Sequence, residues 1–90
     1  MRVVFLGNPE FAIPTLKLLQ RSRHDLVAVV SNKPKPMGRG RILKSTPVGQ
    51  FAKKNKIKLI EPDDLNAIHF QNQLKNFEAD IFVVVAYRIL

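Results

Sequence analysis

The sequence predicts an α/β domain built on a parallel sheet, and three observations lead to that prediction. Short β-branched and apolar runs alternate with segments of helical periodicity along all 90 residues. The connections are long enough to hold crossover helices, which join parallel strands. The runs at 26–30 and 81–86 are continuously apolar, as in sheets covered on both faces. The length allows one domain.

The first half of the chain reads as strand, helix and strand. A strand is expected over 2–6, and Gly7 closes it in a turn. A helix follows over about 13–21, because Pro14 is tolerated only in a first turn and apolar residues recur at helical spacing. The run at 26–30 predicts a second, buried strand. Residues 31–45 hold prolines, glycines and basic residues without apolar periodicity, so we expect a long loop there.

The second half continues the alternation. Thr46 and Pro47 predict an N-cap and first helical residue for a helix to about residue 55. A short strand nearer the sheet edge is expected over 56–60. A third helix should start at 62–64, with Asp63 or Asp64 as its cap and an apolar face made by Ala67, Phe70, Leu74 and Phe77. The run at 81–86 predicts the most strongly buried strand.

Four strands with these connections assemble as half of a doubly wound, Rossmann-like sheet in the order 3-2-1-4. The segments after the first and fourth strands, 7–10 and 86–90, should then meet at the crevice where such sheets bind ligands. No later element covers the fourth strand, and natural domains avoid an open apolar edge. We therefore expect the chain to be the front portion of a longer protein.

Charge is distributed unevenly along the chain. The net charge is +8, and nine basic residues lie between Lys33 and Lys58 with no acidic residue among them. Such a segment favours a polyanionic partner, although a solvated basic surface has the same composition. The absence of cysteine excludes disulfides and thiolate metal sites. No run is long enough to span a bilayer or form a signal-peptide core, which predicts a cytoplasmic protein without membrane or metal partners.

Few residues suggest chemistry on their own. Gly7 stands alone where a dinucleotide site needs three spaced glycines, and residues 31–33 supply no acidic residue for a ribose, which disfavours a nicotinamide enzyme. His24 and His69 are interpreted as solvated histidines. The segment 33–41 differs, because its prolines extend it, its glycines permit close approach, and its arginines suit phosphates and guanine edges. Without aromatic residues, it favours a structured RNA.

Four motifs carry a resemblance to a known family. They are GNPEF at 7–11, PMGRGR at 36–41, STPV at 45–48 and VVVAYRIL at 83–90. In this order and at about this spacing they resemble methionyl-tRNA formyltransferases over essentially the whole chain. The Pro-x-Gly-Arg-Gly loop is the most specific of them. The resemblance therefore implies a truncated formyltransferase fold.

The resemblance also implies an activity and its sites. Such enzymes transfer a formyl group from 10-formyltetrahydrofolate to the methionyl amine of initiator tRNA, and insert the basic loop at the acceptor-stem end. Arg39 matches the inserted arginine, and the implied phosphate contacts are Lys33, Lys35, Arg41 and Lys44. The residues that match the folate-framing positions, largely through backbone groups, are Arg88, Ile89 and Leu90.

The sequence departs from the family in one large respect. The family's catalytic Asn, His and Asp lie beyond residue 90, and so does its second, tRNA-binding domain. The resemblance thus implies that residues 1–90 are the N-terminal part of a formyltransferase catalytic domain, contain no catalytic residue and transfer no formyl group alone. The alternative is a non-catalytic, RNA-binding half-Rossmann module that has kept the basic loop.

Overall fold

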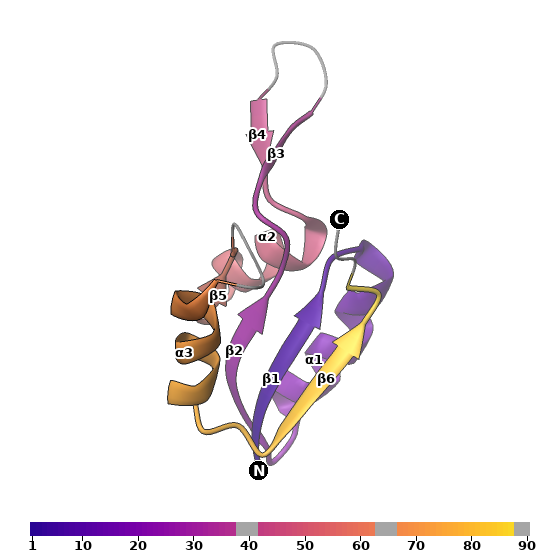
Figure 1. Ribbon diagram of the computed structural model, residues 1–90. Helices are drawn as coiled ribbons and strands as arrows, with labels where there is room; N and C mark the ends of the chain where they lie inside the picture. Colours follow the sequence, from indigo (N-terminus) through magenta and orange to yellow (C-terminus); the bar gives the residue numbers. More distant parts are fainter. Residues whose placement is uncertain (38–41, 63–66, 88–90) are drawn as a thin grey trace.

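A four-stranded parallel sheet forms the centre of the computed structural model, which describes residues 1–37, 42–62 and 67–87 (Figure 1). The strands lie in the order β5-β2-β1-β6, so the predicted order 3-2-1-4 and the Rossmann-like fold class are confirmed. Their bounds are β1, Arg2–Gly7; β2, Asp25–Val30; β5, Leu59–Ile60; and β6, Ile81–Val85.

Helices cover the two faces of the sheet. On one face α1 (Ile13–Arg21) and α2 (Pro47–Lys54) pack over Phe5 and Val29, which are fully buried. On the other face α3 (Ile68–Asn76) packs over the neighbouring residues Val4, Ala28 and Val30. Successive strand residues point to opposite faces, so two apolar layers are built from one sheet.

The first two helices agree with the sequence pattern. A 3₁₀ turn over Glu10–Ala12 leads directly into α1, which has the predicted bounds and holds Pro14 in its first turn. Thr46 caps α2 as predicted, because its hydroxyl oxygen accepts a hydrogen bond of 3.0 Å from the Gly49 backbone N–H.

Residues 31–45 do not form the predicted irregular loop. The segments β3 (Lys35–Met37) and β4 (Ile42–Lys44) pair as an antiparallel hairpin, and residues 38–41 lie outside the described part of the chain. The loop is predicted because residues 31–45 lack apolar periodicity, and apolar periodicity is the signal of buried side chains. This hairpin is instead held by backbone pairing between two short segments, which periodicity does not report.

Two boundaries near the β5 edge also differ from the prediction. The third helix begins at Ile68 and not at 62–64, because Ala67 still has an extended backbone with ψ 132°. The predicted caps, Asp63 and Asp64, lie outside the described residues. The strand expected over 56–60 shortens to β5, since Lys56 has a left-handed backbone with φ 57°. Its edge position is confirmed.

The predicted burial of the last strand is wrong. In β6 the exposed fractions of Phe82 and Val84 are 48% and 60%, whereas Val83 and Val85 pack against the α1 and α2 layer. Within the described residues β6 pairs only with β1, and α3 packs over β1, β2 and β5. A continuous apolar run therefore predicts a strand here, but not which of its faces other elements cover.

Gly7, the last residue of β1, is required for space. Its backbone lies outside the left-handed region, and an added Cβ would stand 2.8 Å from the Val85 carbonyl oxygen. A ring carbon of Phe5 would lie equally close. Gly7 and Val85 are register partners, so the missing side chain lets β1 and β6 end side by side.

We expect Gly7→Ala to destabilise the fold by about 1–3 kcal/mol, since the new methyl group meets a backbone carbonyl that cannot rotate away. Urea unfolding followed by circular dichroism measures the effect. An unchanged unfolding midpoint would show that the two strand ends have room to separate.

Candidate functional site

Three strands end together at one edge of the sheet. Because β1, β2 and β6 are parallel neighbours, the chain leaves all three at their common carboxyl edge, which is where open α/β sheets bind ligands. Figure 1 shows the β3–β4 hairpin rising from this edge at the end of β2, with the end of β6 nearby. The basic hairpin segment and the segment after β6, which are predicted to bind different partners, therefore leave the sheet at one edge.

The hairpin presents positive charge. Its register places Lys35 of β3 directly opposite Lys44 of β4, and Lys33 lies exposed just before β3. Like charges at directly opposite positions of a hairpin are unfavourable for folding. The hairpin thus brings basic residues of two strands together at this edge of the sheet.

Polar side chains close the base of the hairpin. Ser31, fully buried at the end of β2, donates a hydrogen bond of 2.9 Å to the Asn8 side-chain oxygen, which also accepts one of 2.8 Å from the Asn32 N–H. Because the single hydroxyl proton of Ser31 is used in this way, Thr46 is the donor in the contact between the two hydroxyls. The outgoing and returning chains are thereby joined.

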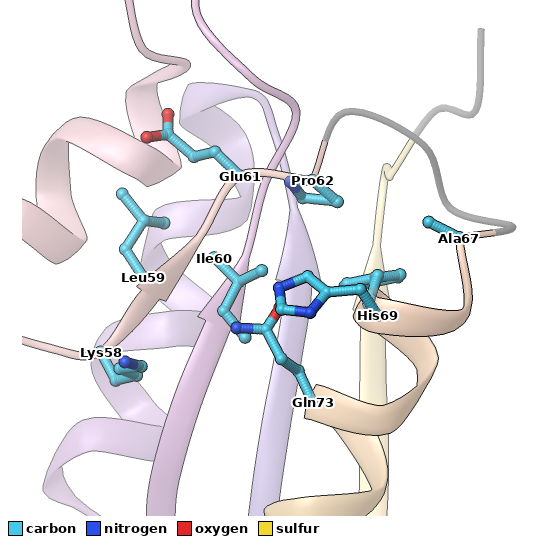
Figure 2. A pocket seen from close by; sticks show the side chains of 9 residues that line it. Lys58, Leu59, Ile60, Glu61, Pro62, Ala67, His69 and Gln73 are labelled. Carbon is cyan, nitrogen blue, oxygen red and sulfur yellow. The ribbon is translucent and has the colours of Figure 1, made fainter.

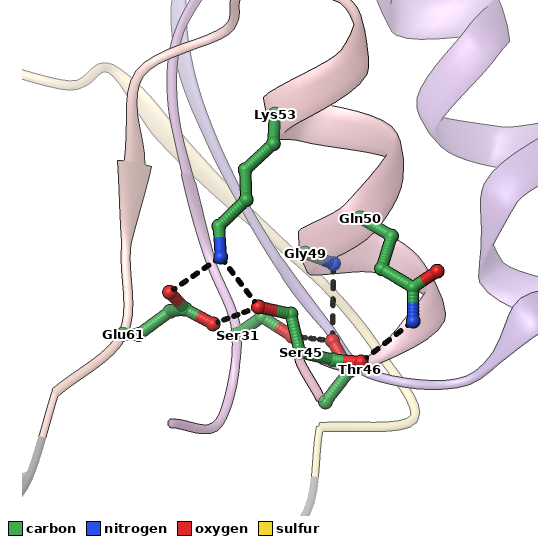
Figure 3. A network of polar contacts seen from close by, with 7 residues as sticks. All are labelled: Ser31, Ser45, Thr46, Gly49, Gln50, Lys53 and Glu61. Atoms are coloured by element: carbon green, nitrogen blue, oxygen red, sulfur yellow. Dashed lines mark hydrogen bonds and ion pairs between the residues drawn. The ribbon is translucent and has the colours of Figure 1, made fainter. Parts of the chain in front are cut away.

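A second group of contacts surrounds Ser45 on the returning chain (Figure 3). The Ser45 hydroxyl donates to Glu61 Oε2 at 2.9 Å and accepts from Lys53 Nζ at 2.7 Å. The Gln50 amide donates to the Ser45 carbonyl oxygen at 2.9 Å. Lys53 and Glu61 form an ion pair of 3.6 Å, with side-chain exposures of 56% and 17%. We call Ser45, Gln50, Lys53 and Glu61 the Ser45 cluster.

Gly49 permits this close packing. A Cβ added to it would lie 3.2 Å from the Ser45 Cβ and 3.3 Å from the Thr46 hydroxyl oxygen. The first turn of α2 can therefore lie against both groups of contacts, and its Gly49 N–H reaches the Thr46 cap. The STPV motif is thus followed by a residue that leaves space for close packing at the hairpin base.

The end of β6 lies beside the end of β1, because Val85 and Gly7 are register partners. Ala86 has a left-handed backbone with φ 51°, so the chain turns sharply after the strand. Tyr87 follows and packs against the layer covered by α3. Burial raises the pKa of the Tyr87 phenol above its ordinary value, because the charged phenolate would lose hydration.

The structure describes only some of the predicted site residues. Lys33, Lys35 and Lys44 lie together on or beside the hairpin. The other five lie outside the described residues: Arg39, Arg41, Arg88, Ile89 and Leu90. Sequence reasoning missed the roles of Asn8, Ser31, Ser45 and Glu61. Polar residues flanking both ends of the 31–45 segment were the available signal, and Thr46 was interpreted only as a helix cap.

Among the described residues, two pockets lie away from the ends of β1 and β6. One, of about 380 Å³, is formed between β5 and α3, where the His69 and Gln73 side chains extend from α3 toward β5 (Figure 2). The other, of about 520 Å³, lies between α1 and α2 and is lined by Lys17 and Lys54. His69 is exposed, as interpreted from the sequence.

The described part of the chain offers neither a metal site nor a membrane-spanning helix. Residues 1–37, 42–62 and 67–87 contain no group of three His, Cys, Asp or Glu side chains that could hold a metal ion. Over the same ranges, each helix is too short or too polar to cross a bilayer.

Comparison with known proteins identifies the family. A family model described as formyl transferase matches residues 1–90, the full length of the chain. The chain belongs to the formyl transferase family. The resemblance noted in the sequence motifs is therefore confirmed.

Curated relatives of this formyltransferase chain carry a more specific name. The methionyl-tRNA formyltransferase of Acetivibrio thermocellus is 41% identical over 87 residues, which cover 97% of this chain and 28% of the relative. Those of Novosphingobium aromaticivorans and Rhodopseudomonas palustris are 41% and 42% identical over 90 residues, covering all of this chain and 30% and 29% of theirs. The chain thus spans about three tenths of the relatives' length.

We expect the only tyrosine of this formyltransferase chain, Tyr87, to ionise above its ordinary pKa of about 10 in the folded protein and near that value after denaturation. The folded state holds the phenolic proton more tightly, so this contribution to stability is complete below pH about 10 and is lost as pH rises through the raised pKa. Ultraviolet absorbance of the phenolate reports Tyr87 alone, since the chain has no tryptophan.

Tyr87→Phe is the control for this titration. The substitution should remove the absorbance change, and the free energy of unfolding should then fall less as the pH rises above about 10. Equal ionisation midpoints in the folded and denatured protein would contradict the burial of the phenol.

Proposed function

We propose that the intact protein is a cytoplasmic methionyl-tRNA formyltransferase, which transfers a formyl group from 10-formyltetrahydrofolate to the methionyl amine of initiator tRNA. Residues 1–90 would form the N-terminal part of its catalytic domain. The observation that carries the proposal is the identity of about 40% to curated methionyl-tRNA formyltransferases along the whole chain. The arrangement of the carboxyl edge supports it independently.

The hairpin supports tRNA binding. Facing lysine positions at 35 and 44 favour contact with phosphates, and Lys33 adds charge beside the hairpin base. In the proposed complex Arg39 enters the acceptor-stem end and Arg41 contacts phosphate, because a guanidinium fork fits both phosphates and guanine edges. The hairpin projects away from the sheet, as a segment that enters a folded RNA must.

The end of β6 supports a folate site at the same edge. The turn at Ala86 and the partly buried Tyr87 follow Val85, the register partner of Gly7, so both lie beside the end of β1. A planar heterocycle bound at this edge could pack against the Tyr87 ring. The residues proposed to frame the folate, largely through backbone groups, follow directly and are Arg88, Ile89 and Leu90. When bound, 10-formyltetrahydrofolate supplies the formyl group, and these residues would hold its pterin.

Formylation of methionyl initiator tRNA tests the function. The intact protein should form product with 10-formyltetrahydrofolate, whereas residues 1–90 alone should form none, because the family resemblance places the catalytic Asn, His and Asp beyond residue 90. Product is measured as formylmethionine released from the tRNA. If the intact protein bound tRNA without forming product, the non-catalytic RNA-binding module would be the correct interpretation.

The site assignment predicts that Arg39→Ala weakens initiator tRNA binding by about 1–3 kcal/mol, since Arg39 is assigned a contact at one defined place. Lys44→Ala should weaken binding less. It should reduce the slope of log affinity against log salt concentration by about one, as expected for the loss of a phosphate contact. Affinity titrations at several salt concentrations measure both effects. Equal behaviour of the two variants would remove the special role of Arg39.

Arg88→Ala is the matched control, because it removes the same side chain from the proposed folate rim. It should weaken binding of 10-formyltetrahydrofolate and leave tRNA binding unchanged. The reverse pattern would overturn both assignments.

A further inference from the structure

We propose that Glu61 is a positioning residue for RNA binding, which acts through Ser45 to hold the basic hairpin in a defined direction. The inference rests on the proposed function of the hairpin and goes beyond it by assigning a role to a residue on a different strand connection. Three observations lead to it: the way the hairpin is attached, the position of Glu61, and the sign of its charge.

The hairpin is attached to the sheet through its two ends. The outgoing end at Ser31 is joined to the turn after β1 through Asn8. The returning end at Ser45 and Thr46 leads straight into α2. Hydrogen bonds at these ends therefore determine the direction in which the hairpin projects, because a two-stranded hairpin has little stability of its own.

Glu61 joins the returning end to a third element. It follows β5, on the far side of β2 from β1, and its carboxylate accepts from the Ser45 hydroxyl and pairs with Lys53 of α2 (Figure 3). Sixteen residues separate Glu61 from Ser45 in the sequence. The Ser45 cluster thus ties together the hairpin, α2 and the connection after β5.

Without such a role, the negative charge of Glu61 would be a disadvantage beside a hairpin that binds RNA. A carboxylate beside a polyanion site lowers the local positive potential and repels phosphate. Glu61 is also largely removed from water, with 17% of its side chain exposed, and is stabilised there by its two partners. A neutral acceptor would avoid the repulsion, but it would bind Lys53 less strongly.

Two substitutions at Glu61 separate the effect of its negative charge from the effect of its hydrogen bond to Ser45. Glu61→Gln removes the charge and keeps an oxygen that can accept from Ser45, whereas Glu61→Ala removes both. If Glu61 positions the hairpin, Glu61→Ala binds initiator tRNA roughly fivefold or more weakly than Glu61→Gln, the effect of losing one hydrogen bond. Glu61→Gln should bind as tightly as the unmodified protein or more tightly. Equal affinities of the two variants would overturn the proposal.

Asp25→Ala is the control for charge alone. Asp25 is an exposed carboxylate at the start of β2, at the opposite edge of the sheet from the hairpin, so its removal makes the same change in net charge. This variant should bind tRNA no more weakly than the unmodified protein. If Glu61→Ala does not fold, Ser45→Ala removes the same connection and should show the same loss of affinity.

A distance measurement tests the positioning without RNA. Residues 1–90 contain no cysteine, so spin labels can be attached at Met37→Cys in β3 and Gln71→Cys in α3 of the intact protein once any cysteine outside residues 1–90 has been replaced. The distribution of distances between the labels should broaden in Glu61→Ala and stay narrow in Glu61→Gln. An unchanged distribution in Glu61→Ala would overturn the proposal, whereas absence of tRNA binding in every variant would instead refute the proposed function.

Discussion

Strand β1 lies between two parallel neighbours, β2 and β6, and this double pairing positions every other element. Parallel neighbours end at a common edge, so the turn after β1, the hairpin base and the turn after β6 are brought together from distant parts of the sequence. The absence of a side chain at Gly7 lets β1 and β6 end in contact. The proposed folate site and the proposed RNA-binding hairpin can therefore share one edge.

Hydroxyl and amide groups connect the base of the hairpin to that edge. Ser31, Thr46 and Asn8 join its two ends, and the Ser45 cluster adds a charged pair on the side of β5. The hydroxyls of Ser31, Ser45 and Thr46 each donate and accept a hydrogen bond, and no buried side-chain polar atom of the described residues lacks a partner. Such contacts are directional, which suits a segment that projects from the sheet.

Much of the fold followed from periodicity and local chemistry. The strand order, the bounds of α1 and the Thr46 cap were predicted because parallel-sheet topology, Pro14 and the Thr-Pro pair constrain the chain locally. The basic residues of the candidate site were also evident, since charge needs no partner to be recognised. The hairpin pairing and the exposure of Phe82 were not predicted, because each depends on which segment lies alongside.

The amino-acid pattern alone determined an α/β chain with a concentrated basic segment and the motifs of a formyltransferase. Tertiary structure decided that Lys35 is the register partner of Lys44, that Glu61 meets Ser45, and that Phe82 and Val84 of β6 are exposed within the described residues. The physical reason is the range of the interactions involved. Helix periodicity, capping and net charge are properties of neighbouring residues, whereas cross-strand register, burial and a hydrogen bond between distant segments exist only after the sheet has brought those segments together.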